Sequence, residues 1–94
     1  MKNIMIGDWI VISKKFLQKN GFNYLFQMWV LSNEKFIIWY EPKTRRLEIQ
    51  STQKNKAKQP MYYAIFKCRY IHEMQQALRM LSIDTKDFAN NLKI

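Results

Sequence analysis

The order of apolar and polar residues predicts several consecutive β-strands in the first two thirds of the chain. Residues 22–40 (FNYLFQMWVLSNEKFIIWY) form two apolar runs separated by the polar stretch 32–35, a pattern typical of two strands joined by a turn. Residues 45–50 alternate cleanly, with Leu47 and Ile49 on one side of an extended strand. A further turn is expected at 41–44, because Pro42 suits the second position of a type I turn.

The segment before these strands is also rich in β-branched and aromatic residues. Residues 4–17 (IMIGDWIVISKKFL) therefore predict a first strand, clearest from Trp9 onward, with a helix capped by Asp8 as the alternative. Asn20-Gly21 follows between two apolar segments and predicts a type I′ hairpin turn, because both residues tolerate positive φ.

The expected turns assign every strand residue to one face of the sheet, since cross-strand partners and residues two apart share a face. The Asn20-Gly21 turn would place Val11 opposite Val30, and the next turn would place Val30 opposite Ile37. The predicted core face holds Ile10, Ile12, Phe16, Leu25, Trp29, Leu31, Phe36, Ile38, Leu47 and Ile49, interrupted by Lys14 and Gln27. The opposite face holds Trp9, Ser13, Lys15, Tyr24, Phe26, Met28, Ile37, Trp39, Arg46 and Glu48.

The remaining third changes from a polar loop to a strand and then to helical spacing. Residues 51–60 (STQKNKAKQP) predict a flexible basic loop, and residues 61–69 predict a fifth strand. An apolar stripe of helical period runs through residues 70–81 at Ile71, Met74, Leu78 and Leu81. Asp84 is the expected N-cap of a short second helix that extends through Leu92.

Strands followed by helices indicate an α+β fold. We expect one domain over residues 1–94, with an antiparallel meander of four to five strands packed against a C-terminal helix and a short second helix. Residues 78–94 also resemble the opening half of the phage-repressor type of helix-turn-helix domain, through the pattern Phe88-Ala89-Asn90-Asn91-Leu92. No recognition helix follows that pattern, so an ordinary helical hairpin is the expected structure.

Composition adds a strong positive charge and an intracellular setting. The 94 residues include 16 Lys and Arg against 7 Asp and Glu, a formal net charge of +9, which favours an anionic partner. Cys68 is the one cysteine, so no internal disulfide is possible, and the protein is expected in the reducing cytoplasm. Neither a secretory signal peptide nor a membrane span is expected, because charges interrupt every apolar run.

The charge and the aromatic residues together favour binding of single-stranded nucleic acid, RNA or DNA. Such proteins combine cations that contact phosphates with aromatic rings on which bases stack. Between residues 42 and 69, eight basic residues accompany one acidic residue, Glu48. The predicted binding residues are Lys15, Tyr24, Phe26, Trp39, Lys43, Arg45, Arg46, Lys54, Lys56, Lys58, Lys67 and Arg69.

Two other functions remain open at this point. The aromatic face could serve a protein-binding inhibitor or adaptor of the kind that phages and mobile elements encode, with an acidic protein or a second copy of the chain as partner. A toxin-like, metal-independent ribonuclease using His72, Arg69 and Tyr70 is the third possibility. No catalytic residue, cofactor or metal site is predicted, because the chain has one histidine, two glycines and scattered carboxylates.

Overall fold

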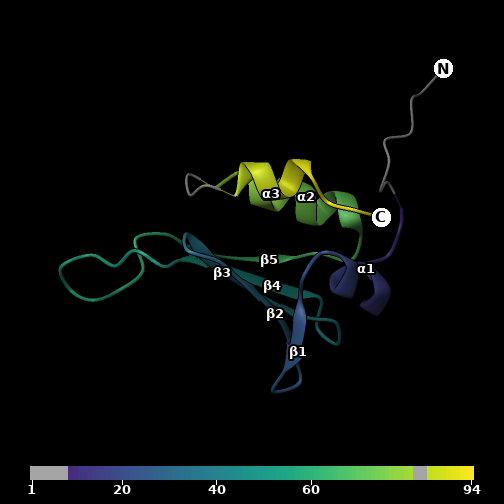
Figure 1. The fold of residues 1–94 in the computed structure, drawn as a ribbon, viewed down its shortest axis with the longest axis horizontal. Helices are drawn as coiled ribbons and strands as arrows, with labels where there is room; N and C mark the ends of the chain where they lie inside the picture. Colours follow the sequence, from purple (N-terminus) through teal and green to yellow (C-terminus); the bar gives the residue numbers. More distant parts are fainter. Residues whose placement is uncertain (1–8, 82–84) are drawn as a thin grey trace.

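The computed structural model describes residues 9–81 and 85–94, which form a five-stranded sheet and three helices. In chain order the elements are α1 (Lys14–Lys19), β1 (Asn23–Leu25), β2 (Met28–Ser32), β3 (Phe36–Glu41), β4 (Arg46–Ser51), β5 (Tyr63–Lys67), α2 (Ile71–Arg79) and α3 (Lys86–Asn90). The strands form one antiparallel sheet in the order β1-β2-β3-β4-β5, and α2 and α3 lie on one side of it (Figure 1). The predicted α+β class is confirmed. No helix in the described part of the chain is long and apolar enough to cross a membrane.

The central strands follow the predicted meander with a different register. Val30 pairs with Trp39, whereas the sequence predicted Val30 opposite Ile37. The difference is a shift of two residues, and side chains alternate between faces with a period of two. The predicted faces of β2, β3 and β4 are therefore correct although the predicted partners are not.

The first strand predicted at residues 4–17 is wrong at its end, because residues 14–17 belong to α1, and its residues 4–8 lie outside the described part of the chain. Ser13 has extended backbone, and its hydroxyl accepts a hydrogen bond from the Phe16 backbone N–H at 3.1 Å, which caps the helix. The β-branched residues before Ser13 do stay extended, and Val11 forms an isolated bridge with Tyr70. The expectation of a cap at Asp8 lies outside the described residues.

Asn20-Gly21 ends this helix instead of forming a hairpin turn. Gly21 has φ of +90°, the Gly21 N–H donates to the Gln18 carbonyl at 3.1 Å, and the Phe22 N–H donates to the Leu17 carbonyl at 2.9 Å. This pair of bonds is the Schellman motif, and the burial of both Leu17 and Phe22 supplies its usual hydrophobic contact. The positive φ of Gly21, which suggested a hairpin turn, instead ends the helix α1.

The first hairpin of the sheet turns at Phe26-Gln27, within the segment predicted to be one strand. These residues have φ of +50° and +65°, as a two-residue type I′ turn requires, although glycine or asparagine is usual there. The turn pairs Tyr24 with Trp29 and Leu25 with Met28. Tyr24 and Leu25 consequently exchange the faces that a continuous strand would have given them.

The core lies between α2 and the helix-side face of the sheet. Ile71, Met74 and Leu78 are almost fully buried, which confirms the predicted stripe, and Leu81 packs against its margin. Of the predicted core residues, Ile10 and Leu25 are exposed because the first strand and the first turn were misplaced. The described core consists of Ile12, Phe16, Leu17, Phe22, Trp29, Phe36, Ile38, Tyr40, Leu47, Ile49, Cys68, Ile71, Met74, Ala77, Leu78 and Ala89.

The second C-terminal helix is present as α3. Its N-cap is Thr85, whose buried hydroxyl donates a hydrogen bond to the Leu78 carbonyl and so ties α3 to the end of α2. The predicted cap, Asp84, lies outside the described residues. Phe88 packs against Phe22 and Phe36, with ring centroids 6.3 and 6.0 Å apart, so α3 also contacts the sheet side of the core.

Replacing Tyr40 by phenylalanine should destabilise the fold. The Tyr40 hydroxyl donates to the Cys68 carbonyl at 2.6 Å, and burial raises the pKa of Tyr40 to about 12. Tyr40→Phe leaves that buried carbonyl without this donor, which should cost about 1–2 kcal/mol in urea unfolding. Tyr63→Phe is the matched control at an exposed position and should change stability by less than about 0.5 kcal/mol. Equal effects of the two substitutions would contradict the role of the Tyr40 bond.

Glu73 should make the stability of α2 depend on pH. Its carboxylate accepts the backbone N–H groups of Tyr70 and Arg69, both at 2.9 Å, and these bonds lower the pKa of Glu73. A lowered pKa means that the stabilisation is complete above the unfolded-state pKa and is lost as the pH falls through the folded-state pKa. Glu73→Ala should cost about 1 kcal/mol in urea unfolding at pH 7, and the cost should shrink at about pH 3. A cost that is independent of pH would contradict this assignment.

Candidate nucleic-acid interface

The sheet face opposite α2 and α3, here called the outer face, is not covered by any element of the described chain (Figure 1). Val30, Trp39, Glu48 and Ile65 form one cross-strand row on it. The strand residues on the outer face are Asn23, Leu25, Met28, Val30, Ser32, Ile37, Trp39, Glu41, Arg46, Glu48, Gln50, Tyr63, Ile65 and Lys67.

The centre of the outer face is apolar and partly open to solvent. Trp39 is half-buried on β3, whereas Tyr63 and Ile65 on the edge strand β5 are 54% and 47% exposed. Tyr63 and Trp39 therefore present aromatic surface on the same side of the sheet, where a planar ring can stack on them.

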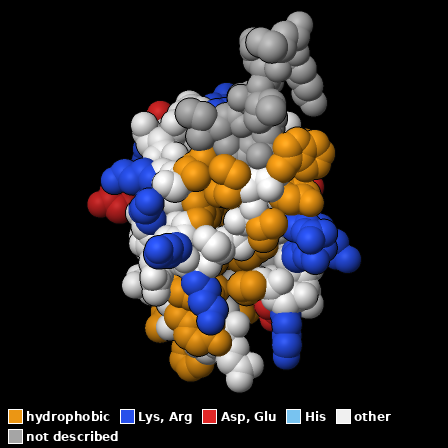
Figure 2. All heavy atoms as spheres, turned by 90° about the vertical axis from the view of Figure 1, so that its right-hand side faces the viewer, with side chains coloured by type: hydrophobic (Ala, Val, Ile, Leu, Met, Phe, Trp, Pro, Cys, Tyr) orange, Lys and Arg blue, Asp and Glu red, His pale blue; other side chains and the backbone are white. Residues whose placement is uncertain are grey.

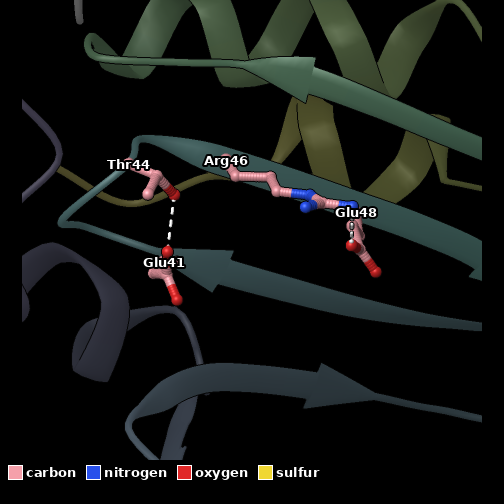
Figure 3. Close-up of polar contacts among 4 residues, drawn as sticks. All are labelled: Glu41, Thr44, Arg46 and Glu48. Carbon is pink, nitrogen blue, oxygen red and sulfur yellow. Dashed lines mark hydrogen bonds and ion pairs between the residues drawn. The ribbon is translucent and has the colours of Figure 1, made fainter.

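One end of the outer face brings two cations together. Arg46 and Lys67 are direct cross-strand partners on β4 and β5, a position at which side chains start about 5 Å apart. Like charges in such a pair destabilise a sheet. The Arg46 guanidinium forms an ion pair with Glu48 at 2.6 Å, and the nearby Glu41 carboxylate accepts a hydrogen bond from the Thr44 hydroxyl at 2.7 Å (Figure 3).

Three more predicted cations belong to this end, which we call the turn end. Lys43 and Arg45 lie in the β3–β4 turn and are exposed, with Arg45 at φ of +61°. Arg69 follows β5, and its guanidinium lies 5.5 Å from the centre of the Tyr70 ring. The turn end therefore includes five cations, Lys43, Arg45, Arg46, Lys67 and Arg69. Of these, Arg46 contacts Glu48, whereas Arg45 interacts electrostatically with Glu73 at the start of α2.

The other predicted cations lie at the opposite end of the strands. Lys54, Lys56 and Lys58 are exposed in the loop 52–62 that extends from β4 and β5 (Figure 1). Asn55 organises this loop, because its side-chain oxygen accepts the backbone N–H groups of Ala57 and Gln59. Six residues of β4 separate the loop from the turn end, about 20 Å at the rise of a β-strand. The flexibility expected for this loop stays a prediction.

Three predicted residues lie away from the outer face. Lys15 is on α1, and Tyr24 lies on the helix-side face, where its ring centroid is 5.2 Å from that of Trp29. Placing Tyr24 beside Trp39 was therefore wrong, and the reason is the turn at Phe26-Gln27. Phe26 is 96% exposed at the tip of that turn, so neither core packing nor backbone preference accounts for an aromatic residue there.

Two residues of the ribonuclease hypothesis, Tyr70 and His72, have stacked rings near the start of α2. The Tyr70 and His72 rings are nearly parallel with centroids 5.8 Å apart, and Trp9 packs edge-on against both. Glu73, the next residue, is engaged in capping the helix. Packing accounts for this arrangement, and the ribonuclease activity stays a prediction.

Comparisons with family models, with curated proteins and with solved structures find no match to this chain. Within residues 9–81 and 85–94, no group of three or more His, Cys, Asp or Glu side chains is placed to hold a metal ion. Cys68 is buried, and burial raises the pKa of its thiol to about 12, so the thiol is protonated at neutral pH. The outer face itself presents cations and aromatic rings.

Sequence reasoning missed Tyr63 as a site residue. In β5, Tyr63, Ile65 and Lys67 share one side of the strand, and all three are exposed. The loop 52–62 prevented the register from being extended to β5, so the sequence did not show that Tyr63 shares a face with Trp39. A cross-strand pairing of the alternating segments 46–51 and 63–67 is the signal that would have found it.

Proposed function

We propose that this chain is a small, basic, non-enzymatic protein that binds single-stranded RNA or DNA across the outer face. The observation that supports this most directly is the Arg46–Lys67 cross-strand pair on an uncovered sheet face. The neighbouring row on the same face, two residues along the strands, contains Trp39 and Ile65. A phosphate can contact both cations if it competes with Glu48 for the Arg46 guanidinium, and bases extending along the sheet reach the apolar centre.

The distribution of charge suits an extended anionic strand. Cations gather at the turn end and on the loop 52–62, with Trp39 and Tyr63 between them. A strand lying along β4 would meet cations at both ends of its path and aromatic surface in the middle. Duplex DNA is a poorer fit, because no described helix projects from this face to enter a major groove.

Removing the Arg46–Lys67 pair should weaken binding and its dependence on salt. For Arg46→Ala/Lys67→Ala we expect affinity for a fluorescently labelled single-stranded oligonucleotide to fall roughly tenfold at low salt, measured by anisotropy. If each cation neutralises one phosphate, the slope of log affinity against log salt should decrease in magnitude by about 1.4.

Lys86→Ala/Lys93→Ala is the matched control, since it removes the same charge from exposed positions near the C-terminus. This variant should keep most of the affinity, because its lysines lie away from the outer face. Equal losses in the two double variants would reduce the effect to net charge alone. No binding of RNA or DNA at low salt would overturn the proposed function.

A protein-binding role is the second candidate, and the aliphatic part of the outer face favours it. Leu25 on β1 and Ile65 on β5 are 50% and 47% exposed. Val30 on β2 and Ile37 on β3 lie on the same face, on strands between β1 and β5. Aliphatic side chains contribute to a protein interface but offer no ring on which a base can stack.

Ile65→Lys separates the two functions. It adds a cation at the centre of the outer face, so it should maintain or raise oligonucleotide affinity while weakening an apolar protein contact. A nuclease-resistant complex recovered with the tagged chain, and lost in Ile65→Lys, would support the protein-binding role. A complex that nuclease treatment abolishes would support nucleic-acid binding instead.

A further inference from the structure

A groove of about 690 Å³ opens between α1, the β1–β2 hairpin and the β3–β4 turn. Tyr24 and Trp29 line it from the helix-side face of the sheet, and Glu41 and Lys43 line it from the turn end, so the groove shares these two residues with the turn end. Figure 2 shows the end of the molecule at which α1 and β1 lie, with apolar side chains along the middle and Lys and Arg side chains on both sides. Its volume is within the range of small-molecule sites, about 300–1,000 Å³.

The aromatic part of the groove consists of one buried and one accessible ring. Trp29 is only 5% exposed and is held in the core, whereas Tyr24 is 58% exposed. Their ring centroids are 5.2 Å apart and their planes are inclined at 55°. The fixed Trp29 ring supports Tyr24, whose accessible surface is available to a planar ligand.

The polar part of the groove matches the edges and the charge of a nucleotide. Gln18 from α1 and Gln27 from the hairpin turn supply amides, each with donor and acceptor atoms that can pair with a base edge. Lys14 and Lys43 supply a cation from each side. Glu41 also lines the groove, and its carboxylate accepts the Thr44 hydroxyl at 2.7 Å, so the three charged residues leave an excess of one positive charge.

We propose that this groove binds a nucleotide, with the base on Tyr24 and the phosphate between Lys14 and Lys43. The proposal does not depend on the Arg46–Lys67 pair, because neither residue lines the groove. A free nucleoside monophosphate and the 5′-terminal nucleotide of a strand present the same chemistry, and the experiment below distinguishes them.

A variant with Trp29 as its one remaining tryptophan reports on the groove. In Trp9→Phe/Trp39→Phe, adenosine 5′-monophosphate and uridine 5′-monophosphate are titrated while Trp29 fluorescence is followed. We expect a saturable change with the monophosphates and at least roughly tenfold weaker binding of the unphosphorylated nucleosides. Saturation by inorganic phosphate alone, with no gain from a base, would overturn the assignment of the ligand as a nucleotide.

Side-chain variants in the same background locate the ligand. Lys14→Ala should weaken monophosphate binding roughly tenfold, whereas Lys15→Ala, the adjacent exposed lysine outside the groove, should leave it unchanged. Tyr24→Ala should abolish the Trp29 response and Tyr24→Phe should preserve it, with thermal melting showing that both variants are folded. An equal loss of monophosphate affinity in the two lysine variants would overturn the proposal. So would the absence of a Trp29 fluorescence response in the Trp9→Phe/Trp39→Phe background.

Two further arms separate the ligand sources and the two sites. If a 5′-phosphorylated oligonucleotide binds more tightly than the monophosphate, and Lys14→Ala removes that advantage, the ligand is the terminal nucleotide of a strand. If the monophosphate binds more tightly, the ligand is a free nucleotide. Arg46→Ala/Lys67→Ala should retain the monophosphate response even if it loses oligonucleotide affinity. Loss of the monophosphate response in that variant would assign the ligand to the outer face and overturn the groove site.

Discussion

Burial of one sheet face beneath α2 is the interaction on which the rest of this structure depends. Ile71, Met74 and Leu78 form one stripe of the helix, and Ile38 and Leu47 are among the sheet residues buried in the same core. The described helices supply only one covering layer, so the opposite face remains open to solvent. Each strand therefore has one side packed in the core and the other side facing solvent, as the alternating burial of β3 and β4 shows.

This division places different chemistry on the two sides of the same strands. On the outer face, half-exposed apolar residues lie between cations at the strand ends, a distribution that suits an extended anionic partner. On the helix side, the short α1 leaves the end of β1 and β2 incompletely covered, and the groove beside Tyr24 results. The tight turn at Phe26-Gln27 connects the two regions, because it sends Leu25 to one face and Tyr24 to the other.

The sequence-based predictions were most accurate in segments whose hydrophobic pattern fits only a strand or only a helix. The alternation at Leu47 and Ile49 and the helical stripe at Ile71, Met74 and Leu78 were both correct, because each pattern buries a continuous surface in only one conformation. They were wrong at residues 13–21, where β propensity favoured a strand. There the Ser13 cap and the Schellman ending at Gly21 stabilise a helix, and Asn-Gly suits a helix end as well as a hairpin.

The amino-acid sequence alone determined the α+β class, the alternating faces of the central strands, the amphipathic C-terminal helix and the excess of positive charge. These properties depend on local periodicity and composition, which are readable from neighbouring residues. Only the tertiary structure decided that Arg46 lies opposite Lys67, that Tyr63 shares a face with Trp39, and that Tyr24 lies beside Trp29. These juxtapositions depend on strand register across turns and loops, and a change of one residue there exchanges the two faces of a strand.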